Sequence, residues 1–310
     1  MPKKRVKRVK SRNRSKGLPG FVYLSILAIV FLSVLTLGNS ILEKKSSYLP
    51  KFVKASVPYT PKLVTVSTIS PYPANYPNSN PEVKPVESGF CLHVPVLMYH
   101  HIQPEAMSVA KKQTSLSVDN GIFDQQMAYL IQNGYTPIYA SDLVNALLTH
   151  TQLSGKPVLV TMDDGYADND TYALPVLRKY GIKANLMLAT GLVGNPDMLS
   201  LDQVRDLASS GLVQFTDHTW SHYPLGNGNE AKDEMEISVG KEEIKSYAGQ
   251  DVNILTYPYG SFSNTAFNAA RKVGIIGAFS SIPGQIQCDS FIMSLHRTHI
   301  GNASLSAYGL

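Results

Sequence analysis

The sequence is poor in several residue types that mark particular protein classes. Its 310 residues include only two cysteines and one tryptophan, and no Cys-x-x-Cys pair is present. A zinc module built on paired cysteines is therefore excluded. Charged residues make up only 16% of the chain and hydrophobic residues 44%, which excludes a wholly disordered protein. Internal repeats are also absent. The length fits more than one small domain, but not three.

Acidic residues are missing from the first 20 positions, which hold nine lysines and arginines. The formal net charge of +5 comes from this segment, because the remaining residues hold 19 basic and 23 acidic side chains, a balance of −4. A protein that binds nucleic acid through a globally basic surface is therefore excluded, and we expect no nucleic-acid partner. The positive charge belongs to a tail, residues 1–20.

The next segment lacks charge altogether. Residues 21–37 are 17 uncharged and mostly apolar residues, the short end of what crosses a bilayer. We interpret residues 21–38 as a single transmembrane anchor with the tail 1–20 in the cytoplasm, because positive residues favour that side. A cleaved signal peptide, which would release a secreted form, is the alternative, although Gly38-Asn39-Ser40 is a poor cleavage site. Either interpretation places the remaining chain outside the cell.

Residues 39–90 are rich in proline, with eight prolines from Pro50 to Pro85. Proline fixes φ and removes a backbone donor, so regular secondary structure is poorly supported there. An extended chain is expected instead. We therefore predict a disordered extracellular linker over residues 39–90, which holds a folded domain of residues 91–310 away from the membrane.

From Cys91 onward, short apolar stretches alternate with helical patterns. The expected strands cover residues 94–102, 157–162, 182–188, 212–216, 252–257 and 275–279. The expected helices cover residues 123–133, 142–149, 172–180, 201–209, 230–248 and 265–273. Such alternation predicts an α/β domain whose parallel sheet is covered by helices, either as a barrel or as a doubly wound sheet.

Polar clusters follow three of the expected strands, at the strand ends where the sites of α/β proteins gather. The first cluster is TMDDGY, residues 161–166, whose adjacent carboxylates Asp163 and Asp164 need a cation or a shared proton to coexist. Taken alone, its Asp-Gly pair is more typical of a turn. A functional interpretation of this cluster therefore depends on a second cluster.

The second cluster is DHTWSH, residues 217–222. Its His218 and His222 are four residues apart, which presents both rings on one side of a helical turn, as a pair of metal ligands requires. Taken alone, two exposed histidines at this spacing are more often accidental. A carboxylate from the first cluster and these two histidines would form three ligands that leave metal positions open for water and substrate.

The third cluster is YPYG, residues 257–260, which fits a tight turn or a backbone N–H aimed at a developing oxyanion. In this order, TMDDGY, HTWSH and TYPYG resemble the motifs of the polysaccharide deacetylase family, carbohydrate esterase family 4 with its NodB-like domain. The resemblance covers about residues 94–300. The opening VLMYHHI and the YPYG motif are most similar to the branch that deacetylates poly-β-1,6-N-acetylglucosamine.

This resemblance implies a distorted (β/α) barrel with fewer than eight strands. It also implies roles for individual residues. Asp164, His218 and His222 match the metal ligands of the family, which usually hold zinc and in some members cobalt, nickel or manganese. Asp163 matches the general base that activates water. Tyr259 matches the residue whose backbone N–H stabilises the oxyanion.

The late motif of the family matches less well. Its histidine, the general acid, is best matched by His296, with His299 as a competitor. On a regular strand these two would face opposite sides, so at most one points inward. The arginine that pairs with the base in the family is replaced by Thr256, and Arg297 is the substitute that the resemblance implies.

The predicted function is metal-dependent removal of N-acetyl groups from an extracellular polysaccharide that contains N-acetylglucosamine, by a membrane-anchored protein that we expect to be a monomer. A catalytically weak or inactive carbohydrate-binding protein remains an alternative, as does an O-acetyl esterase with the same residues. Cys91 and Cys288 would both lie outside the cell, where disulfides form, but their separation of 197 residues leaves a disulfide and two free thiols equally open.

Overall fold

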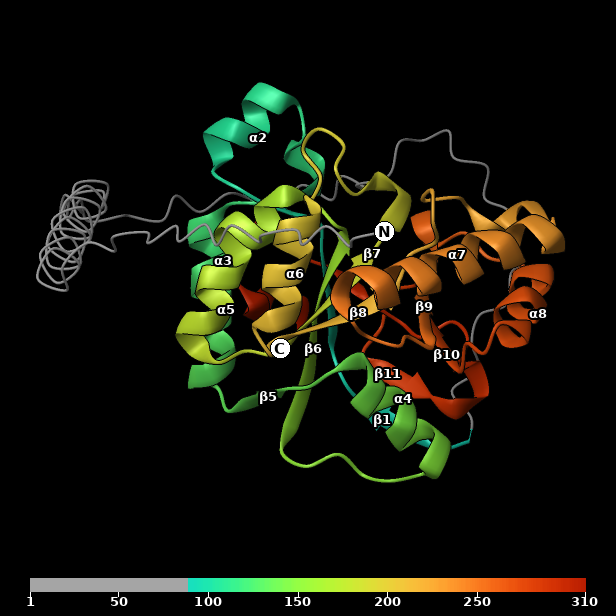
Figure 1. Ribbon diagram of the computed structural model, residues 1–310. Helices are drawn as coiled ribbons and strands as arrows, with labels where there is room; N and C mark the ends of the chain where they lie inside the picture. Colours follow the sequence, from blue (N-terminus) through green and yellow to red (C-terminus); the bar gives the residue numbers. More distant parts are fainter. Residues whose placement is uncertain (1–88) are drawn as a thin grey trace, which may run out of the picture. The chain divides into compact units, whose positions relative to one another are not determined.

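The computed structural model describes residues 89–310, and Figure 1 shows their α/β architecture. The predicted tail (1–20), the predicted anchor (21–38) and the predicted linker (39–90), apart from its last two residues, lie outside the described part of the chain. Within residues 89–310, no helix is both long enough and apolar enough to cross a membrane.

The main sheet has eight strands, and every pairing in it is parallel. Seven of them follow the order β10, β9, β8, β7, β6, β2, β12, and β5 pairs with β6 beside this path. Their bounds are β2 Val96–Tyr99, β5 Tyr135–Pro137, β6 Lys156–Asp164, β7 Ala184–Leu188, β8 Val213–Asp217, β9 Ile254–Thr256, β10 Gly277–Phe279 and β12 Thr298–His299.

One late segment joins the two edges of this sheet. Leu295 forms a parallel bridge to Phe279 of β10, and its N–H donates to Ala278 O at 2.8 Å. A few residues later, β12 pairs with β2, with Thr298 opposite Leu97. The sheet therefore curves round on itself, which agrees with the predicted barrel rather than with a doubly wound sheet.

Helices pack around the outside of this sheet, with α3, α5 and α6 on one side of the view and α7 and α8 on the other (Figure 1). Each expected helix is present; α6 and α7 have the expected bounds, and the ends of the other helices differ from the expected ones by at most three residues. The α6 start has the capping box that the sequence indicates, since Ser200 and Gln203 bond each other's backbone N–H. The bounds are α3 Asn120–Gln132, α4 Ala140–Thr149, α5 Leu174–Tyr180, α6 Leu201–Ser209, α7 Glu230–Ala248 and α8 Asn264–Lys272.

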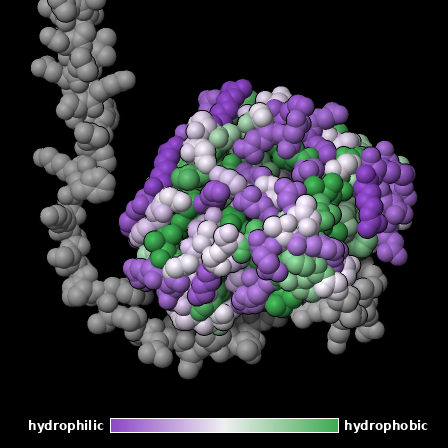
Figure 2. All heavy atoms as spheres, turned by 90° about the horizontal axis from the view of Figure 1, so that it is seen from below, coloured by the Kyte–Doolittle hydropathy of each residue, from purple (hydrophilic) through white to green (hydrophobic). Residues whose placement is uncertain are grey.

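The central strands are apolar along their whole length because both of their faces are covered. All residues of β2 and β7 are buried, as are the last seven of β6. On the outside, Figure 2 shows hydrophobic residues scattered among hydrophilic ones on the face seen from below. The polar ends of the central strands therefore stand out as the exception to an apolar interior.

Two small sheets flank the two ends of β2. Before it, β1 (Cys91–His93) pairs antiparallel with β11 (Ile286–Cys288), with Cys91 directly opposite Cys288. These two cysteines form a disulfide, so the free-thiol alternative is wrong. After β2, β3 (His101–Ile102) pairs parallel with β4 (Ser117–Val118).

The connection between β3 and β4 was not expected from the sequence. It contains α2 (Glu105–Lys111) and a 3-10 turn, Thr114–Leu116. Lys111 reaches across to Asp197, with 2.6 Å between Nζ and Oδ1. Because β3 follows the C-terminal end of β2, this connection lies at the end of the sheet where the polar clusters gather.

Candidate functional site

The parallel strands carry the three polar clusters to one end of the sheet. Asp163 and Asp164 are the last two residues of β6, and His218 directly follows β8. Tyr257 follows β9, which neighbours β8. Clusters that are far apart in the sequence are therefore neighbours in space.

Asp164, His218 and His222 come together as three possible metal ligands, with one ligand atom from each lying within 4.8 Å of the others. His218 Nε2 lies 3.2 Å from Asp164 Oδ1, and His222 Nε2 lies 3.1 Å from the same oxygen. That oxygen is buried and receives no hydrogen bond of good geometry. The two rings and the carboxylate thus converge on one point, as ligands of a cation do.

The other nitrogen of each ring is held by a separate partner. His218 Nδ1 lies 2.8 Å from the backbone oxygen of Thr256, and His222 Nδ1 lies 3.1 Å from the Tyr259 hydroxyl. Such outer contacts fix the orientation of a ligating ring and leave Nε2 for the metal. Although burial acts to raise the pKa of Asp164, its contacts with the two imidazoles hold this pKa well below the usual value, so the carboxylate is ionised.

The backbone at this site is unusual. Within residues 89–310, seven non-glycine residues have a positive φ, and four of them lie here: Asp164 at 71°, Thr219 at 64°, His222 at 58° and Tyr259 at 60°. Such conformations cost free energy for residues with a side chain, and they persist where the surrounding structure enforces them. Two of the four are possible metal ligands, so the ligand geometry is held under strain.

Asp163 forms a bidentate ion pair with Arg297. The Nη1 and Nη2 atoms of Arg297 lie 2.6 and 2.7 Å from the two carboxylate oxygens, and each residue is only 2% exposed. Arg297 Nε also donates to the backbone oxygen of Ser280 at 2.9 Å. Burial acts to raise the pKa of Asp163, but the guanidinium outweighs it, and the pKa lies below its usual value. Asp163 is therefore ionised, with Arg297 as the partner that the resemblance implies.

His296 is not among the residues that line the pocket, which argues against our preference for it over His299. Its ring stacks on Phe291 at 4.6 Å between centroids, and its backbone bonds the side chain of Gln287. His299, at the end of β12, lines the pocket instead. The physical reason is that the two residues are three apart on an extended chain and therefore face opposite sides.

His100 is a pocket residue whose importance the sequence did not establish. It directly follows β2, and the register opposes Tyr99 with Met162, which places His100 beside Asp163. Its ring centroid lies 5.6 Å from that of His299. Burial lowers the pKa of His100, and it lowers that of His299 to about 4, with His100 contributing. The available signal was the position of His100 at the end of an expected strand.

The three possible metal ligands, together with Asp163, Arg297, His100 and His299, line one cavity of about 430 Å³. Tyr259 lies at this cavity with 47% of its surface exposed, and its ring packs 4.5 Å from that of His222. The turn around Tyr259 is tight, because a side chain at Gly260 would meet Ser281 Oγ at 1.9 Å. The cavity is lined by Met98, His100, Ser115, Leu116, Asp163, Asp164, Tyr166, Leu192, Met198, His218, His222, Tyr257, Tyr259, Gly260, Ser281, Arg297 and His299.

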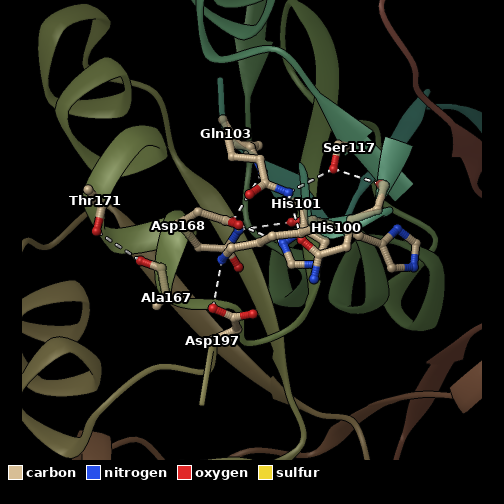
Figure 3. A network of polar contacts seen from close by, with 12 residues as sticks. His100, His101, Gln103, Ser117, Ala167, Asp168, Thr171 and Asp197 are labelled. Carbon is tan, nitrogen blue, oxygen red and sulfur yellow. Dashed lines mark hydrogen bonds and ion pairs between the residues drawn. The ribbon is translucent and has the colours of Figure 1, made fainter. Parts of the chain in front are cut away.

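A network behind the pocket fixes the segment that carries His100 (Figure 3). Asp168 lies 2.6 Å from His101 Nδ1 and accepts a hydrogen bond from the Ile102 N–H at 3.1 Å. Asn169 Nδ2 donates to the backbone oxygen of His100 at 2.9 Å. A π-helix, Asn169–Ala173, begins at this point, and such turns are frequent at functional sites. The end of β2 is therefore held on its outer side.

Comparisons with known proteins agree with this geometry. The sequence model of the family described as polysaccharide deacetylase matches residues 150–278. A Bacillus subtilis protein that carries the name polysaccharide deacetylase YxkH is 30% identical over 218 residues, covering 70% of this chain and 75% of that protein. The solved structure of the Streptococcus pyogenes deacetylase PplD in complex with acetate has a TM-score of 0.64 and 26% identity, covering 70% of this chain and 98% of that one.

A further relative is the poly-β-1,6-N-acetyl-D-glucosamine N-deacetylase of Escherichia coli K12, which is 23% identical over 248 residues. The match covers 66% of this chain, but only 36% of the length of that protein. The family match, the similarity over most of the B. subtilis relative and the shared fold all support the same family. The chain belongs to the polysaccharide deacetylase family.

Proposed function

We propose that this protein removes N-acetyl groups from a cell-surface polysaccharide that contains N-acetylglucosamine, with the help of a divalent metal. The observation that carries the proposal is the approach of His218 Nε2 and His222 Nε2 to one buried oxygen of Asp164, at 3.2 and 3.1 Å, with ionised Asp163 next to it. The E. coli relative named for this polymer supports the substrate class. The predicted anchor at residues 21–38 supports the location.

The three ligand residues fit a divalent cation. Two imidazole nitrogens and one carboxylate oxygen suit zinc, and also cobalt, nickel or manganese. The unsatisfied, buried Oδ1 of Asp164 is the kind of atom that a cation would satisfy. Held there, the metal would polarise the acetyl carbonyl and lower the pKa of water toward about 7. Zinc is the first choice because it favours this mixture of ligands.

We assign the role of general base to Asp163. A carboxylate has about four lone-pair sites, and Arg297 occupies only two of them. A remaining site takes the proton of the attacking water while the water oxygen bonds to the acetyl carbon. Arg297 keeps the carboxylate ionised and oriented throughout.

The amine has to leave with a proton. We assign its delivery to His100, which lines the cavity beside Asp163: the proton that Asp163 takes from the water would pass through this ring to the amine nitrogen. We assign the stabilisation of the oxyanion to the backbone N–H of Tyr259. The C–N bond then breaks, acetate is released, and the free amine stays on the sugar. His299 lies beside His100 and is neutral near pH 7, since its pKa is lowered to about 4.

The test is acetate release by the purified full-length protein, with zinc or cobalt added, from three substrates: oligomers of β-1,6-linked N-acetylglucosamine, oligomers of β-1,4-linked N-acetylglucosamine, and O-acetylated xylan. We expect acetate from the first. Asp163→Asn is the control: it should still bind metal while its turnover falls by about two orders of magnitude or more, as after loss of a general base.

Other outcomes decide against the proposal. Acetate from xylan alone would indicate an O-acetyl esterase with the same residues. Metal binding and glycan binding without acetate release from any substrate would indicate an inactive carbohydrate-binding protein. Unchanged turnover in Asp163→Asn would remove this residue from the role of base.

A further inference from the structure

The loop that carries two of the proposed metal ligands is strained and needs support from outside. Between His218 and His222, Thr219 has a φ of 64°, and His222 itself has a φ of 58°. Side chains make these left-handed conformations unfavourable, so the chain would leave them if nothing held it. The positions of His218 and His222 therefore depend also on contacts made by the residues between them.

The strongest of these contacts come from one buried carboxylate on α7. Glu236 is fully buried, and both of its oxygens accept hydrogen bonds from Ser221, the residue just before His222. Oε2 accepts from the Ser221 N–H at 2.8 Å, and Oε1 accepts from the Ser221 hydroxyl at 2.7 Å. The backbone oxygen of Glu236 accepts from the Trp220 N–H at 2.9 Å. One residue of α7 thus binds two consecutive residues of the loop.

The helix can come this close because of the glycine one turn further on. A side chain at Gly240 would lie 2.4 Å from Asp217 Oδ1 and 3.4 Å from the backbone carbon of Thr219. The same Asp217 oxygen accepts a hydrogen bond from the Thr219 N–H at 2.9 Å. The loop is therefore clamped from α7 by Glu236 and packed directly against the helix at Gly240.

Within residues 89–310, Glu236 forms one ion pair, and its two atoms are far apart. Lys232 Nζ lies 3.6 Å from Oε1, on a side chain that is 41% exposed. Burying a carboxylate without a close cation costs free energy unless its oxygens accept hydrogen bonds. Here the oxygens of Glu236 accept hydrogen bonds from the loop. Its negative charge also lies behind a loop that presents two ligands to a cation.

From these contacts we propose that Glu236 is a positioning residue for the metal site: through Ser221 it holds His222, and with it the ligand geometry, ready for a divalent cation. This inference rests on the proposed function, because it needs the metal site to exist. Outer contacts of this kind typically change metal affinity by about 10- to 100-fold when they are lost.

The test compares Glu236→Gln with Glu234→Gln in the full-length protein. Both change one carboxylate of α7 to an amide, but Glu234 is 45% exposed and faces Lys272 at 3.9 Å. In Glu236→Gln one oxygen becomes an NH₂ group. The remaining oxygen can still accept from the Ser221 N–H, but the Ser221 hydroxyl has to turn and accept instead of donating, and both charge-assisted bonds are lost. We expect Glu236→Gln to weaken binding of Zn²⁺ and Co²⁺ by about 10- to 100-fold and Glu234→Gln to leave it unchanged.

A second readout separates positioning from mere structural support. The visible absorption of bound Co²⁺ depends on the geometry of its ligands, so it should change in Glu236→Gln and not in Glu234→Gln. The thermal midpoint of the metal-free protein reports any general loss of stability. Ser221→Ala removes one of the two bonds to Glu236 from an exposed position, and it decides the matter if Glu236→Gln does not fold: it should also weaken metal binding, by a smaller factor.

The inference is overturned if Glu236→Gln, or Ser221→Ala where the first variant is unfolded, binds Co²⁺ with the affinity and the spectrum of the unchanged protein. A lower thermal midpoint with unchanged affinity and spectrum would overturn it as well. Failure of the unchanged protein to bind Zn²⁺ or Co²⁺ would instead refute the proposed function.

Discussion

The ion pair between Asp163 and Arg297 allows a quantitative prediction. Arg297→Ala would remove the two bonds at 2.6 and 2.7 Å and leave a carboxylate that is only 2% exposed without its cation. Breaking a buried pair by removing one partner costs about 3–5 kcal/mol, because the remaining charge stays desolvated. We expect the free energy of unfolding, measured by urea denaturation of the metal-free protein, to fall by that amount near pH 8.

The pH dependence of this loss follows from the pKa of Asp163. In the unchanged protein this pKa lies below its usual value of 3.8, despite burial, because of Arg297. The carboxylate therefore adds stability above that usual value and loses it as the pH falls through the folded-state pKa. Without Arg297, burial raises the pKa, so ionisation of Asp163 destabilises the fold as the pH rises above 3.8. The difference between the two proteins should thus be larger at pH 8 than at pH 4.5.

Two further variants make this prediction specific. Arg205→Ala removes an arginine that is 59% exposed and pairs with an exposed Asp202, so it should cost at most about 1 kcal/mol. The double variant Asp163→Asn, Arg297→Ala removes both buried charges and should recover part of the stability lost in Arg297→Ala. A loss in Arg297→Ala as small as that in Arg205→Ala would refute the reasoning.

Two other predictions concern single side chains. His100→Gln should lower kcat for acetate release by about 10²- to 10⁴-fold, as for loss of a general acid, whereas an equal loss in His296→Gln would contradict the assignment. Asp233 is fully buried, its oxygens accept no hydrogen bond, and burial, Glu230 and Glu236 raise its pKa to about 6. Its ionisation therefore destabilises the fold progressively from about pH 4 to above pH 6. Asp233→Asn should raise the free energy of unfolding by about 1–3 kcal/mol at pH 8 and change it little at pH 4. Equal gains at both pH values would refute this reasoning.

Most of the secondary structure could be predicted because burial and periodicity are local signals. The apolar strands and the capped helix at Ser200 are examples. The convergence of Asp164 with His218 and His222 could also be predicted, since parallel strands bring their C-terminal ends to the same edge. These signals depend on residue type and spacing, which the sequence contains in full.

The remaining features depend on long-range geometry. The disulfide joins residues 197 positions apart, and only the register of β1 against β11 brings them together. The side of the chain that His296 faces depends on the short strand β12, which has only two residues and little pattern to read. Glu236 and Ser221 are 15 positions apart in the sequence, and no local motif predicts their contact.

The disulfide also determines how force would enter the domain. Residue 89 is followed at once by β1, which leads into the N-terminal end of β2, whereas the cavity lies at the opposite end of the same strand. Tension on the preceding chain would pass from Cys91 across the sulfur bridge to Cys288, and so into a second strand. A pull on residue 89 would therefore be shared by two strands before it could separate β2 from its neighbours, and it would act at the end of β2 opposite the cavity.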